Sequence, residues 1–498
     1  MSQNTAAAAC YDPAKAPRKV AFVGSECYPF IKTGGLGDVM YALPRALIRE
    51  NCETRVILPL YNCMAEKYKN MLAYKGSFMM DLTMEGRTFY VGIMETEMDG
   101  VIYDFIDNRE FFDWGNPYTG LWEDIPKFCF FSKAALAVLN YLEWIPDIIH
   151  CHDWQAALVP MYLRTRFNTT PVAAAKTVLT IHNLRFQGIC SIEHLKYWSG
   201  LRDDLFDYPV LKHNEDEANM FKGGLAFADW ITTVSSTYAE EIQTPSYGEG
   251  LDSHLRYHQP RLSGIVNGID TDVFNPKKDP ALFQNYDWRT FVEGKAVNKA
   301  KVQERCGLPQ RPTVPLLAMI TRLVGHKGID LLCYVMDRLM NMDVQLVILG
   351  TGEKKFEQAL LDAQARYPDK LSVNLCFDTA FANQIYAGAD IYLMPSRSEP
   401  CGLSQIIAMH YGAVPVVNET GGLKDTVTAY NTDTHEGRGY TFQSYNADDF
   451  LAAIGRCIDL YVWTLDRFHD LARNDMQLDV SWTVPAEKYM DMFRSLLN

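Results

Sequence analysis

The segment KTGGLGD, residues 32–38, sets a lysine beside two adjacent glycines shortly after the first apolar run of the chain. Gly34 and Gly35 offer backbone amides, and Lys32 adds a mobile positive charge. Asp38 opens a helical stretch, and amides at a helix N-terminus attract anions. The spacing is neither G-x-G-x-x-G nor G-x-x-x-x-G-K-[ST]. The loop therefore predicts a phosphate or diphosphate contact, with a plain strand-to-helix turn as the alternative.

A second basic loop, TRLVGHKG (321–328), places Arg322 and Lys327 between an apolar run and a helical stretch. Arginine offers a forked donor and lysine a compact point charge, so the two can converge on one anion. Solvated surface charges are the alternative. The position just after a strand favours an anion site.

The stretch PSRSEPCGLSQ (395–405) carries Glu399 between an apolar run and a helical stretch. A carboxylate there can accept hydrogen bonds from hydroxyl groups, and the amides of Leu403 and Ser404 can contact an anion. Cys401 is a competing nucleophile, but it needs a histidine base that the sequence does not place. We therefore favour a binding role for this stretch.

The stretches HCHDW and IHN hold four possible metal ligands, His150, His152, Asp153 and His182. Alternation along a strand sends His150 and His152 to one face and Asp153 to the other. No H-E-x-x-H set is present. We therefore predict histidine and asparagine side chains around a polar ligand, and no metal cofactor.

Composition limits the class of protein. The 498 residues are 48% hydrophobic and 22% charged, which indicates a globular protein of two or more domains. The net charge of -14 opposes binding to nucleic acid or an anionic membrane. Twelve cysteines without a C-x-x-C pair favour reduced thiols. Without a long apolar segment or a signal-peptide pattern at the N-terminus, a cytoplasmic enzyme is expected.

Short β-branched runs alternate with longer helical patterns, and the alternation restarts after a segment rich in Gly, Asn and Pro at 261–280. This predicts an α/β protein with two doubly wound, Rossmann-like domains, 1–262 and 263–478. A last helix over 479–498 could pack on either domain, and we assign it to the N-terminal one. Ligands bind at the carboxyl ends of parallel strands, so two such edges facing each other predict a deep cleft that closes around its ligand.

At this point the motifs resemble a known family. KTGGLGDV, HCHDWQAAL, TIHNLRFQG, RLSGIVNGID, TRLVGHKGID, PSRSEPCGLSQ and ETGGLKDTV follow one another as in bacterial glycogen synthases and plant starch synthases. The resemblance runs from about Lys19 to the C-terminal helix. It implies the GT-B glycosyltransferase fold and a retaining enzyme that transfers glucose from ADP-glucose to the non-reducing end of an α-1,4-glucan, elongating glycogen.

The resemblance also implies roles for the donor-binding residues. Lys32, with Gly34 and Gly35, matches the loop that contacts the sugar nucleotide, and Arg322 and Lys327 match the pair that binds the diphosphate. Phe377 stands where the family usually has a tyrosine near the base, which keeps the stacking face and loses the hydroxyl.

For the transferred sugar and the acceptor, the resemblance implies a further set. Glu399 matches the glutamate that holds the glucose hydroxyls. The other residues matched to this region are His182, Asn183, Asp38, Tyr118, Asp153, Cys401, Gly402, Leu403 and Ser404. Lys127 and Phe128 stand where arginine and phenylalanine are common, in a helix expected to begin at Ile125-Pro126.

We predict a same-face route to retention, with Arg322, Lys327 and loop amides stabilising the leaving ADP and the backbone carbonyl near His182 supporting the reacting carbon. The second TGGL motif, at 420–423, lacks a preceding lysine and is assigned to the rim of the cleft or its sugar side. Alternatives are a related transferase that uses UDP-glucose or a small acceptor, and a non-catalytic carbohydrate-binding protein. An NAD-dependent oxidoreductase is disfavoured because G-x-G-x-x-G is missing.

Overall fold

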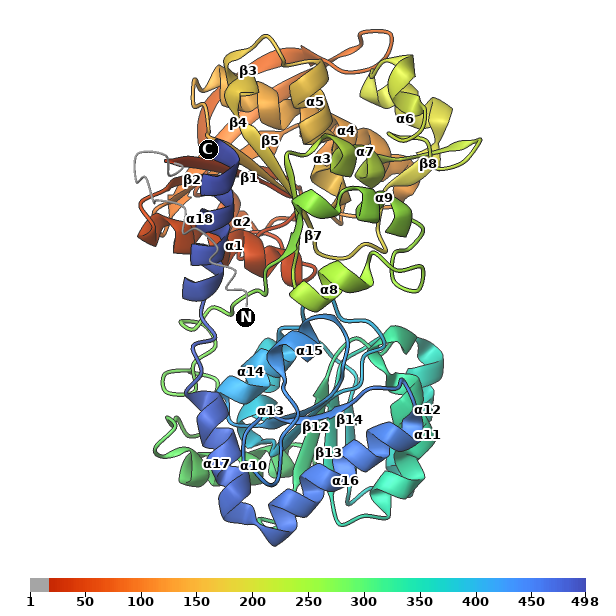
Figure 1. The fold of residues 1–498 in the computed structure, drawn as a ribbon. Helices are drawn as coiled ribbons and strands as arrows, with labels where there is room; N and C mark the ends of the chain where they lie inside the picture. The colour runs from red at the N-terminus through yellow and green to blue at the C-terminus, as the bar shows by residue number, and fades with distance from the viewer. Residues whose placement is uncertain (1–17) are drawn as a thin grey trace, which may run out of the picture. The chain divides into compact units, whose positions relative to one another are not determined.

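The computed structural model describes residues 18–498 and divides the chain into two compact units (Figure 1). The first unit holds the described residues up to Thr232, together with Glu249–Ile265 and Thr483–Asn498. The second holds Thr233–Gly248 and Val266–Trp482. The prediction that the N-terminus lacks a signal peptide rests on residues 1–17, which lie outside the described residues.

The first unit is built on a nine-stranded sheet in the order β11-β10-β7-β6-β1-β2-β5-β4-β3. Its strands are β1 (Lys19–Val23), β2 (Glu53–Pro59), β3 (Ala73–Asp81), β4 (Thr88–Met98), β5 (Val101–Asp107), β6 (Ile148–His152), β7 (Lys176–Ile181), β10 (Trp230–Thr233) and β11 (Leu262–Gly264). Strands β7, β6, β1, β2 and β5 pair in parallel, whereas β3 and β4 form an antiparallel extension at one edge. The parallel strands are buried on both faces, as apolar β-branched runs predict.

Helices cover this sheet. They are α1 (Gly35–Arg49), α2 (Glu66–Lys69), α3 (Arg109–Phe112), α4 (Leu121–Tyr141), α5 (Leu158–Thr165), α6 (Ile192–Ser199), α7 (Met220–Phe227), α9 (Asp252–Tyr257) and α18 (Thr483–Leu497). A small sheet of β8 (Ile189–Ser191) and β9 (Glu217–Asn219) precedes α6 and α7. The C-terminal helix α18 packs beside α1 (Figure 1). Just after α1, the sulfur atom of Cys52 lies 3.5 Å from that of Met490 in α18, although more than 430 residues separate the two in sequence.

The second unit has a six-stranded parallel sheet in the order β14-β13-β12-β15-β16-β17. Its strands are β12 (Leu316–Ile320), β13 (Gln345–Leu349), β14 (Leu371–Asn374), β15 (Ile391–Met394), β16 (Val414–Asn418) and β17 (Tyr440–Phe442). Counted within the unit, the order is 3-2-1-4-5-6, that of a Rossmann-type sheet. The prediction of two α/β domains built around doubly wound, largely parallel sheets is therefore confirmed.

The helices of the second unit are α8 (Ser236–Glu241), α10 (Phe291–Arg305), α11 (Ile329–Met340), α12 (Lys354–Arg366), α13 (Thr379–Gly388), α14 (Ser404–His410), α15 (Gly421–Thr426), α16 (Ala447–Trp463) and α17 (Leu465–Met476). The observed division differs from the predicted domain limits in one respect that matters. Residues Thr233–Gly248, which contain α8, belong to the second unit although they precede the predicted boundary at 262. Within the described residues, no helix is long and apolar enough to span a membrane.

Candidate active site

In the second unit, the predicted residues lie on loops that follow β12 and β15, the neighbouring strands at which the strand order reverses. Arg322 and Lys327 follow β12, and Glu399 follows β15. Connections from this pair of strands leave the sheet in opposite directions, which opens a crevice at their carboxyl ends where ligands bind. The sheet topology therefore brings the two predicted motifs to one site.

Lys327 and Glu399 form an ion pair with 2.5 Å between Nζ and Oε2. The Ser396 hydroxyl donates to the same carboxylate oxygen at 3.0 Å. Glu399 is only 7% exposed, so this charged pair is held in a largely desolvated place. No other described residue hydrogen-bonds to Oε1 of Glu399, which leaves that oxygen to accept a hydroxyl of a ligand.

Arg322 supplies a second cation on the loop that follows β12, five positions before Lys327. It is exposed, and its guanidinium makes no hydrogen bond or ion pair with any residue from 18 to 498. Phe377, on the loop between β14 and α13, is 89% exposed. Both side chains are free to contact a ligand.

The surroundings of Cys401 disfavour a nucleophilic role for its thiol. The residue is 6% exposed, and burial raises the pKa of the thiol to about 12. The thiolate, which is the reactive form, is therefore scarce near neutral pH. Gly402, in the same turn, has a φ of 71°, and α14 begins at Ser404 after Leu403 as its N-cap.

The second TGGL motif contacts the backbone of the loop that carries Glu399, and its assignment to the cleft rim or the sugar side stays a prediction. The amide of Gly422 donates to the carbonyl oxygens of Glu399 at 3.0 Å and Pro400 at 3.1 Å. A Cβ on Gly422 would lie 2.0 Å from the carbonyl oxygen of Cys401, and one on Gly421 would lie 2.1 Å from that of Glu399. Only glycines let the start of α15 approach the Glu399 backbone this closely.

Helices α8 and α15 cap each other. Glu241, at the end of α8, accepts the Gly421 amide and the Thr420 hydroxyl, each at 3.0 Å. Asp425 of α15 in turn accepts the amide of Thr237 at 3.1 Å and its hydroxyl at 2.5 Å. The anion at the second TGGL loop is thus a carboxylate of the chain itself, and α8 belongs to the second unit for this reason.

In the first unit, the KTGGL loop is also held by a carboxylate that the sequence analysis did not assign. Glu26, 3% exposed, accepts the amide of Thr33 at 2.5 Å and its hydroxyl at 2.7 Å. Burial raises the pKa of Glu26, and hydrogen bonds from Thr33 and Gly34 oppose that rise. The Gly34 amide is therefore already engaged, and Gly35 is the first residue of α1.

Lys32 remains accessible at the surface of this loop. Its Nζ lies 2.7 Å from Oδ1 of Asp38, in the first turn of α1, and the two side chains are 37% and 29% exposed. An exposed pair of this kind contributes little to stability. Lys32 can therefore exchange Asp38 for an anionic ligand at small cost.

A chain of histidines lies at the carboxyl ends of β6 and β7. His152 Nδ1 and His182 Nε2 share a hydrogen bond of 2.9 Å, and the ring of His150 stacks on that of His152 with 4.3 Å between centroids. Tyr489 of α18 lies 5.3 Å from the His150 ring. Burial lowers the pKa of His182 to about 3, so the ring is neutral at pH 7.

Asp153 fixes the backbone at the IHN motif. Its Oδ1 accepts the His182 amide at 2.8 Å, and the Asn183 amide also hydrogen-bonds to its side chain. Asp153 itself has a φ of 58° with a ψ of -174°, a strained conformation for a residue with a side chain. Burial raises the pKa of Asp153 to about 7. The predicted pair of Asp153 and His182 is thus in direct contact.

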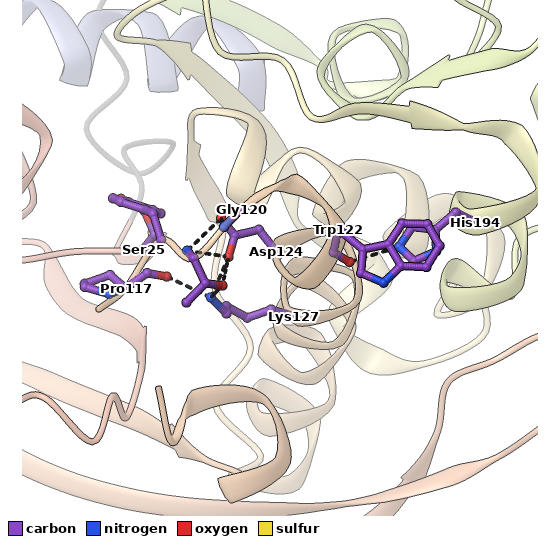
Figure 2. Close-up of polar contacts among 9 residues, drawn as sticks. Ser25, Pro117, Gly120, Trp122, Asp124, Lys127 and His194 are labelled. Atoms are coloured by element: carbon purple, nitrogen blue, oxygen red, sulfur yellow. Dashed lines mark hydrogen bonds and ion pairs between the residues drawn. The ribbon is translucent and has the colours of Figure 1, made fainter. Parts of the chain in front are cut away.

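Tyr118 lies on a loop that a buried ion pair holds in place (Figure 2). The hydroxyls of Tyr118 and Ser25 share a hydrogen bond of 2.8 Å. Lys127, 1% exposed, donates to Oδ1 of Asp124 at 2.6 Å and to the Pro117 carbonyl at 2.9 Å. Helix α4 begins at Leu121, so the expectation that it begins at Ile125-Pro126 is wrong, and Pro126 lies inside it. Asp124, which accepts the Thr119 and Gly120 amides, provides the earlier start.

Neither a metal-binding cluster nor the large cavity beside α4 lies among the predicted site residues that the structure describes. Within residues 18–498, no group of three or more His, Cys, Asp or Glu side chains is arranged to hold a metal ion. A cavity of about 680 Å³ lies elsewhere in the first unit, lined in part by Phe78 of β3 and Tyr141 of α4. None of the predicted site residues lines it, so we do not connect it with the chemistry.

Comparison with known proteins gives concordant results for both units. Residues 19–257 match the family described as starch synthase catalytic domain, and residues 303–474 match glycosyl transferases group 1. The chain is 44% identical over 480 residues to a glycogen synthase of Lachnospira eligens, covering 96% of this chain and all of the relative. It is 44% identical over 484 residues to one of Desulforamulus reducens, covering 96% and 99%.

Solved structures agree. The catalytic domain of starch synthase IV from Arabidopsis thaliana, bound to ADP and acarbose, superposes with a TM-score of 0.89 at 32% identity, covering 97% of this chain and 99% of that one. Sucrose-phosphate synthase from Thermosynechococcus elongatus, with a TM-score of 0.60 at 17% identity and coverage of 96% and 99%, shares the fold.

Proposed function

The chain belongs to the glycogen synthase family, and from this premise we propose that it transfers glucose from ADP-glucose to the non-reducing end of an α-1,4-glucan, with retention at the anomeric carbon. The observation that carries the proposal is the cluster of Arg322, Lys327 and Glu399 at the switch point of the second sheet. ADP as the leaving group is supported by the related plant starch synthase, whose solved structure holds ADP.

In this proposal, Arg322 and Lys327 bind the diphosphate of the donor. Charge develops on the diphosphate as the bond to glucose breaks, and fixed cations stabilise that charge most strongly in a desolvated site. Arg322 has no competing partner among the described residues. Lys327 is already oriented by Glu399 at 2.5 Å, so little ordering is needed when the donor binds.

Glu399 orients the transferred glucose. Because Lys327 and Ser396 both donate to Oε2, we assign Oε1 the task of accepting a sugar hydroxyl. Phe377 offers an open aromatic face for the adenine base. We assign the amides of Leu403 and Ser404, at the start of α14, to the diphosphate, because backbone amides at a helix start can contact an anion.

The residues of the first unit are assigned to the sugar and the acceptor. A neutral His182 ring cannot serve as a cationic acid. We therefore assign the task of stabilising the reacting carbon to the backbone carbonyl of His182. Asp153 orients this carbonyl through the amides to which it is hydrogen-bonded. Asp153 is thereby a positioning residue and not a nucleophile, in keeping with a same-face route. Lys32, Asp38, Tyr118 and Asn183 are assigned to donor and acceptor contacts.

Glucose incorporation into glycogen tests the proposal. Purified enzyme is incubated with glycogen and radiolabelled ADP-glucose or UDP-glucose, and labelled polymer is measured after precipitation. We expect faster incorporation from ADP-glucose. Faster incorporation from UDP-glucose would overturn the choice of donor, and no incorporation from either would overturn the transferase itself. The cytoplasm remains the compartment expected from the sequence.

A further inference from the structure

Trp122, the second residue of α4, presents its indole to solvent. The residue is 69% exposed, which is unusual for so large an apolar side chain, and neither the motifs nor the mechanism uses it. Its ring lies parallel to that of His194 of α6, with 4.1 Å between centroids and 21° between planes (Figure 2). His194 thus supports the indole from one side.

The sequence builds this stack through Pro126. In a regular helix the amide of residue 126 donates to the carbonyl of residue 122, but proline has no N–H. The Trp122 carbonyl is therefore left without its helical donor, and His194 Nε2 donates to it instead at 3.1 Å. Ser191, the N-cap of α6, accepts the His194 amide at 3.3 Å. The histidine is fixed through both its backbone and its ring.

The stacked pair of Trp122 and His194 is also connected to the loop that carries Tyr118. Asp124 and the buried Lys127 hold the turn that joins this loop to α4 (Figure 2). Trp122 comes four positions after Tyr118 in the chain, which limits the distance between their Cα atoms to at most about 14 Å. An aromatic face held this firmly loses little conformational freedom when it binds a ligand.

We infer that Trp122, supported by His194, is a stacking platform for a glucose ring of the glucan acceptor, outside the transfer site. The inference rests on the proposed function, because only a polymeric acceptor extends beyond the site of transfer. The apolar C–H face of a pyranose ring packs on an indole, and nearby carboxylates accept its hydroxyls. Glu123 and Glu193 are exposed next to the two rings in sequence, and their charge disfavours the anionic donor here.

The chain offers a matched control. Trp463, at the end of α16 in the second unit, is 78% exposed and has no assigned role. Trp122→Ala and Trp463→Ala are compared with wild type for KM with glycogen, KM with ADP-glucose, and retardation by glycogen in native gels. We expect Trp122→Ala to raise KM for glycogen about three- to tenfold and to weaken retardation, the effect of losing one aromatic contact. Trp463→Ala should change KM for glycogen less than twofold. Neither variant should change KM for ADP-glucose more than twofold.

The inference is overturned if the two variants behave alike with glycogen. It is also overturned if Trp122→Ala raises KM for ADP-glucose instead, or if it changes the oligomeric state in size-exclusion chromatography without changing retardation. His194→Ala should weaken retardation less than Trp122→Ala. Gel retardation needs no turnover, so a wild type that is retarded but transfers no glucose would contradict the proposed function and leave this inference standing.

Discussion

The amide of Gly422 donates a hydrogen bond to the carbonyl oxygen of Glu399 at 3.0 Å. This contact joins the start of α15 to the backbone of Glu399, whose carboxylate we assign to the glucose hydroxyls. The position of α15 is in turn set by Glu241 and Asp425, which join it to α8. The geometry of the Glu399 backbone therefore depends on contacts made by Gly422, Glu241 and Asp425.

Gly422→Ala should lower kcat about 10- to 100-fold, because an added Cβ would lie 2.0 Å from the Cys401 carbonyl oxygen and must displace the loop. Gly455→Ala is the control, since a Cβ on Gly455, inside α16, meets nothing within 4 Å. That change should leave kcat within about twofold and stabilise the fold by about 0.4–1 kcal/mol. Kinetics and melting temperatures of both variants check this. A kcat for Gly422→Ala within threefold of wild type would refute the dependence of Glu399 on α15.

Lys127→Met should lower the free energy of unfolding by about 3–5 kcal/mol, because it leaves the buried Asp124 carboxylate without its cation. Lys301→Met, in an exposed pair whose side chains are 50% and 58% exposed, should change it by less than about 1 kcal/mol. Urea titrations of both variants measure the difference. Equal losses would show that the Lys127 network does not stabilise the Tyr118 loop.

Asp153→Asn should change how stability depends on pH. Burial raises the pKa of Asp153 to about 7 in the folded chain, against about 3.9 when unfolded. The folded state therefore keeps the proton over a range in which the unfolded state has lost it, and stability from this group falls as pH rises from about 4 to 7. The melting temperature of wild type relative to Asp153→Asn should decline between pH 5 and pH 7.5. A difference that is constant or grows with pH would contradict the raised pKa.

Chelation should not reduce transfer. Arg322 and Lys327 supply two positive charges for the leaving diphosphate, which is the task a metal ion performs in other transferases. Incorporation of glucose into glycogen should be the same before and after dialysis against EDTA. Activity that is lost on dialysis and restored by Mg²⁺ or Mn²⁺ would contradict this prediction.

The parallel core was predictable because its strands are buried on both faces. Leu316–Ile320 and Ile391–Met394 are such apolar runs, and the loops that follow them carry the predicted site residues of the second unit. The antiparallel strands β3 and β4 are not predicted from the sequence. Buried and exposed positions do not alternate regularly along β4, and the strand carries two glutamates. The start of α4 is predicted wrongly because proline is common in the first turn of a helix, whereas Pro126 lies inside α4.

Contacts between distant segments could not be predicted. Thr237 and Asp425 are 188 residues apart, and Glu241 and Gly421 are 180 apart. Each is a single side chain meeting a backbone or hydroxyl group, so neither leaves a periodic pattern in the sequence. Glu26 is similar, although its place just after β1 was a weak signal that a polar group lay at the strand end.

The most direct test of the account is the turnover of Arg322→Ala and Lys327→Ala with ADP-glucose and glycogen. Removing a cation that stabilises the leaving diphosphate should lower kcat about 100- to 1,000-fold in each variant. Arg311→Ala, which breaks an exposed pair with Asp343 in the same unit, serves as the control and should stay near wild type. If kcat falls by less than tenfold in both Arg322→Ala and Lys327→Ala, the switch-point cluster does not perform the transfer that we assign to it.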